Sequence, residues 1–239
     1  QFKTMYQGEA IRLLHEVVKK GNSTNEERDR FISLIEQAAQ SGKYVGFGEL
    51  AIRHYSQPNL SGAQKEARDI SIPADHPWMN LLAQIGAKYN LPLDIHIEPD
   101  ENTLPGFEKL IAGNPNTKFI FDHAGWYNTG EGTPKLFDRM LGTYPNLYAS
   151  IKIRKPQSDE QKKVAIFDSQ EKLIDSWEQV FTKYSDRFMC GSDVKFGLAE
   201  GGEGDESILV QYPKLLKQLP YETAQKIATE NAKTLFKIN

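Results

Sequence analysis

The chain alternates between two hydrophobic periods. Apolar residues recur at helical spacing in residues 9–20 and 23–42, so both stretches predict amphipathic helices. Shorter runs that are apolar almost throughout, and rich in β-branched and aromatic residues, indicate buried strands at 43–50, 91–98, 117–123, 146–153 and 187–193. Further helical patterns lie at residues 76–90, 104–113, 133–145, 158–186 and 221–238.

Strands that alternate with helices predict a parallel sheet whose strands are joined by right-handed crossovers, which is the α/β class. Ser23 and Glu26 have the spacing of a capping box at the start of the second helix. No internal repeat or linker divides the 239 residues. We therefore expect one domain over residues 1–239.

The composition limits the classes of partner that the protein is expected to bind. The net charge is −3, and basic and acidic residues are interspersed, so there is no electrostatic footprint for nucleic acid or for a membrane surface. The single Cys190 cannot form an intramolecular disulfide, and no apolar run is long enough to span a bilayer. We expect a soluble protein that binds a small-molecule substrate, favour the cytoplasm over the periplasm, and leave its oligomeric state open, a homo-oligomer included.

Residues that can bind a metal or move a proton lie at the ends of four predicted strands: Glu49, His96, His123 and Asp193. The remaining strand places Lys152 near its end. Each alone has an ordinary explanation, because a histidine can be a hydrogen-bonded core residue and a carboxylate can cap the next helix. Together they favour a site, since the carboxyl ends of parallel strands converge.

The residue types indicate a catalytic metal. Imidazole and carboxylate together suit Zn²⁺, Mn²⁺, Fe²⁺ or Ni²⁺, and the set contains no cysteine, which argues against a structural zinc cluster. We expect Zn²⁺ first, with the other three as alternatives. A cation of this kind activates water and polarises a carbonyl or phosphoryl oxygen, while Asp193 accepts a proton. The predicted reaction is hydrolysis.

Four segments carry a resemblance to a known family. VGFGEL, LPLDIHIE, FIFDHAGW and MCGSD occur in this order before a last helix that contains IATENAKTLF. The set resembles the amidohydrolase superfamily, in particular its amidohydrolase-related branch, over about residues 43–236. The resemblance implies a TIM-type (β/α)₈ barrel that binds a metal through Glu49 on its fourth strand, His96 on the fifth, His123 on the sixth and Asp193 on the eighth. Lys152 falls on the seventh strand, where the family has no fixed ligand.

The sequence departs from this family at its front. There is no His-x-His motif, which the family has on its first strand, and the residues before 43–50 leave room for a helix or two but not for three strands. A barrel that lacked three strands would expose sheet edges and core. We therefore expect the chain to be part of a longer protein, with a degenerate barrel as the alternative.

Other residues are expected at the mouth of the site. Arg53 and His54 are predicted on a loop after the fourth strand, where they could hold an anionic substrate group or be merely solvated. Trp126 could form an aromatic wall, and Lys152 could contact an anion or carbonyl. Glu98 shares a strand face with His96 and could orient it or contact substrate.

The predicted function is a metal-dependent hydrolase of an ester, lactone or amide, with Asp193 and His123 as its catalytic residues. Three alternatives stay open. The same branch of the superfamily includes metal-dependent decarboxylases of aromatic acids, and related metal hydrolases act on phosphate esters. A non-catalytic barrel would explain the missing His-x-His motif.

Overall fold

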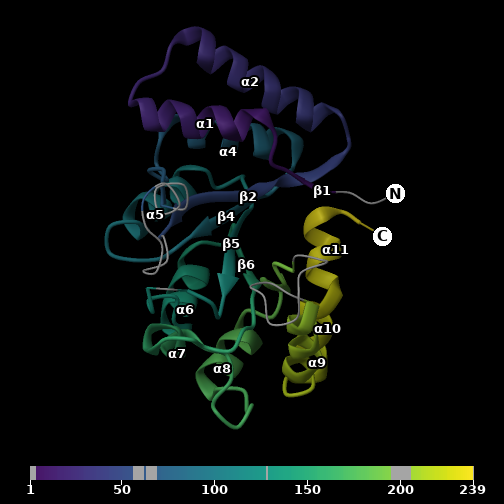
Figure 1. Cartoon of the computed structure of the whole chain (residues 1–239). Coiled ribbons are helices and arrows are strands. Elements are labelled where there is room, and N and C mark those ends of the chain that lie inside the picture. The colour runs from purple at the N-terminus through teal and green to yellow at the C-terminus, as the bar shows by residue number, and fades with distance from the viewer. Residues whose placement is uncertain (1–3, 56–61, 63–68, 128, 195–205, 239) are drawn as a thin grey trace. The chain divides into compact units, whose positions relative to one another are not determined.

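The structure is a computed structural model that describes residues 4–55, 62, 69–127, 129–194 and 206–238. The chain forms two compact units, Gln1–Ile120 and Phe121–Asn239, which we describe separately as the first and the second unit. The boundary between them falls inside strand β5, Phe119–Ala124 (Figure 1).

The first unit is built on parallel strands. Strands β1 (Thr4–Tyr6) and β4 (Leu93–Ile97) both pair in parallel with β2 (Tyr44–His54), and β3 (Ile70–Ser71) pairs with the end of β2 in the antiparallel direction. The chain reaches β5 beside β4, where the Leu93 N–H donates to the Lys118 carbonyl at 2.9 Å. The parallel order is the one that the alternating pattern predicts.

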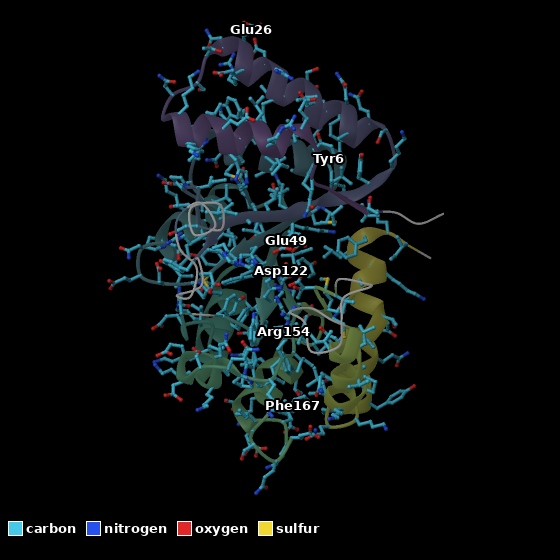
Figure 2. All side chains as sticks on the ribbon, viewed as in Figure 1. Tyr6, Glu26, Glu49, Asp122, Arg154 and Phe167 are labelled. Carbon is cyan, nitrogen blue, oxygen red and sulfur yellow. The ribbon has the colours of Figure 1, made fainter. Side chains whose placement is uncertain are left out.

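Helices of the first unit bury their apolar faces against one another and against the strands. Helix α1 (Glu9–Lys20) packs on α2 (Asn25–Gln40), and α2 packs on α4 (Pro77–Tyr89) (Figure 1). At the second contact, the Phe31 and Trp78 rings stack with centroids 4.7 Å apart. Helix α5 (Leu104–Gly113) then leads to β5. Figure 2 shows the contrast along this part of the chain between Tyr6, which is buried, and Glu26, which is exposed.

The second unit repeats the pattern. Strand β6 (Leu147–Ile151) pairs in parallel with β7 (Phe188–Cys190). Helix α6 (Pro134–Thr143) precedes β6, and α7 (Asp159–Val164) and α8 (Asp175–Lys183) lie between β6 and β7. The chain closes with five helical segments, η1 (Glu206–Val210), α9 (Gln211–Leu216), α10 (Tyr221–Gln225), the π-helical turn η2 (Lys226–Glu230) and α11 (Asn231–Phe236).

Three expectations about the helices and the first strand are wrong in detail. The capping box at α2 is formed by Thr24 and Glu27, one residue later than predicted, because the Thr24 hydroxyl is the one that accepts the Glu27 N–H. The predicted helix 158–186 is broken, since Phe167 and Leu173 form a β-bridge around a turn. The Asp168 carboxylate holds that turn by accepting the Gln170 and Lys172 N–H groups. Finally, β1 is a parallel strand that precedes the first predicted one.

Strand β2 is longer than expected, and this changes where two site residues lie. It runs to His54 rather than ending near residue 50, so Arg53 and His54 belong to a strand and not to a loop. The extension has hydrogen-bonding neighbours on both sides, because β3 pairs with Arg53 and His54 while the Glu98 N–H donates to the Arg53 carbonyl at 3.0 Å. Backbone pairing therefore fixes both residues.

The α/β class and the TIM-type (β/α)₈ fold are confirmed, as a partial barrel. In both units, parallel strands are joined through helices, and β3 is the antiparallel exception among the described strands. In the part of the chain that the structure describes, no helix has the length and apolarity needed to cross a bilayer.

Gly48 is required where β2 approaches β4. Its φ is 147°, and a Cβ there would lie 2.6 Å from Asp94 Cβ and 2.7 Å from the Asp94 carbonyl oxygen. We expect Gly48→Ala to lower the free energy of unfolding by about 2 kcal/mol or more, as measured by urea denaturation. Gly113→Ala is the matched control, because nothing lies within 4 Å of its Cβ position. Equal effects of the two substitutions would contradict this assignment.

Cys190 at the end of β7 is a structural thiol. Burial raises its pKa to about 12, and the thiolate is the reactive form. We expect the native chain to react with a disulfide reagent at pH 8 about 100-fold or more slowly than the chain in urea. Similar rates in both conditions, measured by absorbance of the released thiol, would show that the thiol is not protected.

Candidate active site

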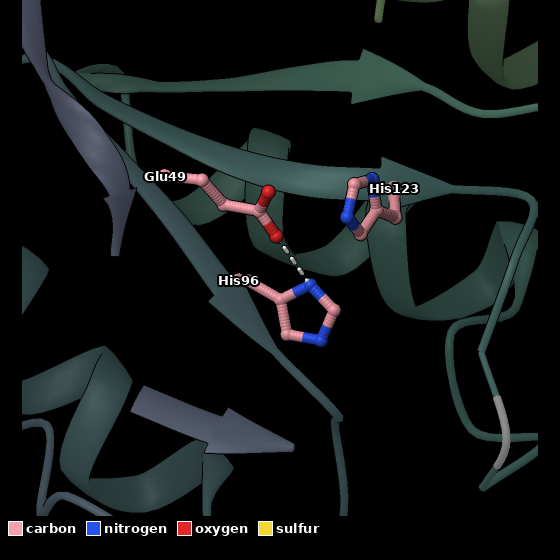
Figure 3. Close-up of side chains that lie close together, drawn as sticks. All are labelled: Glu49, His96 and His123. Carbon is pink, nitrogen blue, oxygen red and sulfur yellow. Dashed lines mark ion pairs between the residues drawn. The ribbon is translucent and has the colours of Figure 1, made fainter. Parts of the chain in front are cut away.

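Glu49 of β2 and His96 of β4 form an ion pair on one face of the sheet. The Glu49 Oε1 lies 2.8 Å from the His96 Nδ1, and Figure 3 draws this pair as a dashed line. His96 is buried, whereas Glu49 keeps about a third of its side chain exposed, at 32%. Two sequence-predicted metal ligands of the first unit are therefore within direct contact.

The register of β2 against β4 creates this arrangement. Phe47 pairs with Leu93 and Leu50 with Ile95, so β2 uses one more residue than β4 over this stretch. An extra residue turns the following side chains to the other face of a sheet. This shift leaves Glu49 on the same face as His96.

A second register shift places His54 on the face that carries His96. It falls between Ala51, which pairs with His96, and Arg53, which pairs with Ile97. Glu49 and His54 are an odd number of residues apart and would point to opposite faces of a regular strand. Because of the shift, His54 lies with His96 and Glu98.

His54, His96 and Glu98 form a compact group of possible metal ligands within the first unit. One ligand atom from each lies within 4.8 Å of the others, and the two imidazole rings have centroids 5.2 Å apart. Glu98 is only 2% exposed. A buried carboxylate is stable only when hydrogen bonds or opposite charges compensate it. Glu98 therefore requires such partners, which an apolar core residue does not.

Arg53 takes a different position from His54. Its guanidinium contacts the Asp69 carboxylate at 2.5 Å and the Ile70 carbonyl at 2.7 Å, and it lies 3.5 Å from the centre of the Tyr55 ring. The Tyr55 hydroxyl in turn donates to Asp100. These contacts hold the chain at the end of β2, and a contact of Arg53 with substrate stays a prediction.

In the second unit, His123 lies near the end of β5 and is held by two neighbours. Its backbone N–H donates to Asp122 Oδ1 at 3.0 Å and to Ser150 Oγ at 3.2 Å. The Ser150 hydroxyl donates to Asp122, and the His123 Nδ1 lies 3.4 Å from the same carboxylate. His123, also drawn in Figure 3, has a φ of 68°, which few non-glycine residues adopt. Such a conformation is typical of functional sites.

Asp193 also has a left-handed backbone, with a φ of 48°, and it is surrounded by positive charge. The Lys152 Nζ lies 2.5 Å from its Oδ2, and the Arg154 guanidinium lies 3.4 Å from the same oxygen. Both cations also lie over the Trp126 ring, at 5.9 and 5.5 Å from its centre. Lys152 and Arg154 thus lie on the same side of the Trp126 ring as Asp193, and three of the predicted site residues, Trp126, Lys152 and Asp193, meet here.

Sequence reasoning did not include Asp122 and Ser150. The sequence does indicate them, because Asp122 directly precedes His123 and Ser150 lies two positions before Lys152. A carboxylate that orients a ligating histidine is a usual feature of metal sites. The register shifts were not visible, although Gly46 and Gly48 mark where a strand can bulge.

We expect Asp122→Asn to weaken binding of Zn²⁺ by about 10-fold, because the amide keeps the shape of the carboxylate but loses its charge beside His123. Competition with a chromophoric chelator measures this affinity. Asp186→Asn serves as the control, because the Asp186 carboxylate is 68% exposed. Unchanged affinity in Asp122→Asn would remove Asp122 from the site.

Comparison with known proteins identifies the family of the chain. The family model described as amidohydrolase matches residues 4–238. A comparison with curated proteins gave no match.

Among solved structures, the chain is similar to dihydroorotase from Campylobacter jejuni, with 20% identity and a TM-score of 0.56, over 87% of this chain and 62% of that one. It is similar to dihydroorotase from Saccharomyces cerevisiae, in complex with 5-fluoroorotic acid, with 15% identity and a TM-score of 0.55, over 87% and 64%. It is also similar to 2,6-dihydroxybenzoate decarboxylase from Rhizobium, with 14% identity and a TM-score of 0.52, over 96% of this chain and 76% of that one.

These structures share the fold with this chain, which spans less than two thirds of the two dihydroorotases. The family model covers nearly all of the sequence and includes every residue of the candidate site. The chain belongs to the amidohydrolase family.

Proposed function

We propose that the protein is a metal-dependent hydrolase that cleaves an ester, lactone or amide bond of a small molecule. The observation that carries the proposal is the 2.8 Å distance between Glu49 Oε1 and His96 Nδ1. Two ligands at about 2.1 Å from one cation lie about 3.0 Å apart in an octahedral shell and about 3.4 Å apart in a tetrahedral one, so a small separation of this pair would admit the ion. Membership of the amidohydrolase family supports the same chemistry.

The proposed ligands are Glu49, His96, His123 and Asp193, the set that the sequence predicts. Glu49 lies inside β2, His96 and His123 are the second-last residues of β4 and β5, and Asp193 follows β7. The carboxyl ends of parallel strands are where such folds bind ligands. We propose this set within a single domain, and Zn²⁺ first among the cations, followed by Mn²⁺, Fe²⁺ and Ni²⁺.

A divalent cation at this position would lower the pKa of a coordinated water toward about 7 and polarise the scissile carbonyl. Asp193 accepts the proton of the attacking water when it is not a ligand itself. Lys152, at 2.5 Å from Asp193 Oδ2, keeps this carboxylate in place. His123, fixed by Asp122 and Ser150, holds its imidazole in one orientation for binding and proton transfer.

The proposed substrate is a small molecule with an anionic or carbonyl group. Lys152 and Arg154 beside Trp126 supply positive charge and a flat apolar wall, which suits a planar anion. His54 lies among the buried residues around His96, while Arg53 would need to leave Asp69 to reach a substrate. No feature of the charge distribution favours a nucleic acid or a membrane as partner.

The test is a hydrolysis assay on a panel of lactones, cyclic amides and aryl esters. We expect the metal-free protein to be inactive and added Zn²⁺ or Mn²⁺ to restore turnover, whereas Glu49→Gln should not recover with either metal. Full activity of the chelator-treated enzyme, or of Glu49→Gln, would contradict the proposal.

A second candidate function is decarboxylation of an aromatic acid. The observation that favours it is Trp126 flanked by two cations, an arrangement that fits an aromatic carboxylate. Release of carbon dioxide from dihydroxybenzoates, without hydrolysis of the panel, would establish it. Absence of both reactions and of bound metal would instead favour a non-catalytic barrel.

A further inference from the structure

We propose that His54, His96 and Glu98 form a second position for a divalent cation, built from the first unit alone. This position goes beyond the proposed function and shares only His96 with its ligand set. It needs neither Glu49 nor any residue of the second unit as a ligand.

The donor set fits a transition metal. One ligand atom from each of the three residues lies within 4.8 Å of the other two, which is close enough for small side-chain rotations to bring all three onto one ion. Two imidazoles and one carboxylate make up the His₂Glu set that holds catalytic zinc with a further coordination position open. The ring centroids of the two histidines lie 5.2 Å apart at an interplanar angle of 34°.

The backbone of the first unit fixes the three residues relative to one another. His96 and Glu98 are two residues apart on one chain, so they share a face. His54 joins them through the register shift between Ala51 and Arg53, and the Glu98 N–H donates to the Arg53 carbonyl at 3.0 Å. Ladder hydrogen bonds on both strands thus hold the site before any cation binds, which lowers the entropic cost of binding.

The buried carboxylate of Glu98 favours binding of a cation. Glu98 is 2% and His96 8% exposed, so the carboxylate is largely removed from water next to two imidazoles. A divalent cation would compensate this charge more strongly than a neutral imidazole can. His54, which is half-buried, leaves one side of the group accessible to an entering ion.

Glu49 takes a different role toward this second position. A neutral imidazole has one lone pair, so His96 ligates through one nitrogen while the other carries a proton. The His96 Nδ1 lies 2.8 Å from Glu49 Oε1, so with the proton on Nδ1 the ligating atom would be Nε2. Glu49 is then a positioning residue of the kind that orients a ligating histidine. The two cation positions are therefore alternatives that compete for His96.

The experiment measures binding of Co²⁺ by the full chain, through its visible absorption and by competition with a chromophoric chelator. The double variant Glu49→Gln/His123→Ala removes the ligands of the first position, while the amide oxygen introduced by Glu49→Gln could still accept from His96. We expect this variant to bind one Co²⁺ per chain, within about tenfold of the wild-type affinity. Adding His54→Ala, or separately Glu98→Gln, should weaken that binding by about 30-fold or more.

Matched controls separate metal binding from loss of folding. Glu101→Gln in the same double variant removes an exposed carboxyl from the segment after Glu98 and should leave Co²⁺ binding unchanged. Circular dichroism and thermal unfolding identify any variant that does not fold. His54→Ala and Glu98→Gln test the position independently, so a folding defect in one leaves the other informative.

The outcomes distinguish this inference from the proposed function. The second position does not exist if the double variant binds no Co²⁺, or if neither His54→Ala nor Glu98→Gln changes its affinity for Co²⁺. Hydrolysis by the wild type would still support the proposed function in that case. If Co²⁺ binding requires His54 and Glu98 but substitution of Glu49 and His123 leaves the rate of hydrolysis unchanged, the second position is supported and the proposed ligand set is wrong.

Discussion

His96→Ala is expected to lower metal-dependent hydrolysis by about 10³-fold or more at a fixed Zn²⁺ concentration. His96 is the residue shared by both candidate ligand groups, in contact with Glu49 at 2.8 Å and grouped with His54 and Glu98. Metal assistance contributes several kcal/mol to such a reaction, and each 1.36 kcal/mol corresponds to a factor of about ten in rate. The measurement is kcat/KM together with the bound Zn²⁺ per chain, both of which should fall.

The control is His15→Ala, which removes an imidazole from α1. We expect this variant to keep its zinc and its activity. If His96→Ala retained both zinc content and kcat/KM while it remained folded, neither cation position could be correct.

Asp193→Asn is expected to lower kcat by about 10²- to 10⁴-fold, the usual contribution of a positioned general base. The amide has the shape of the carboxylate but cannot accept the proton, and it loses the charge that faces Lys152 and Arg154. If Asp193 is a base, KM and zinc affinity should change little. If it is a ligand, zinc affinity should also fall.

The pH dependence separates this role from a structural one. Loss of a general base removes the acidic limb of the kcat profile, whereas a weakened ion pair with Lys152 would lower stability without altering the shape of that profile. Asp186→Asn, which changes an exposed carboxyl before β7, is the control. Wild-type kcat in Asp193→Asn would exclude Asp193 from catalysis.

Much of the fold was predictable because local patterns agree with it. The buried strands have the predicted apolar runs, and three helices end at Gly or Asn, namely α1 at Gly21, α4 at Asn90 and α5 at Asn114. The 158–186 region was not predictable as two helices. Its apolar residues fit one helical stripe, and only the Asp168 turn, a local competition for backbone N–H groups, breaks it.

The site was predictable in its residue types but not in its geometry. Placement of His96, His123 and Asp193 at or near strand ends follows from apolar runs that finish in polar residues. Glu49 was also predicted at a strand end but lies inside β2, because this strand continues to His54. The grouping of His54 with His96 and Glu98 depends on a register shift, which arises from how β2 pairs with β4 and leaves no period in the sequence. Short strands such as β1 and β3 were missed because their few residues carry no measurable alternation.

Anomalous scattering from crystals of the zinc-loaded protein, measured on both sides of the zinc absorption edge, shows directly whether His96 binds the metal. We expect a peak at about 2.0–2.1 Å from a ring nitrogen of His96. Its other ligands should be Glu49 and His123 at the first position, or His54 and Glu98 at the second. Zinc bound only at sites that exclude His96, or no zinc at all in the intact protein, would contradict the account.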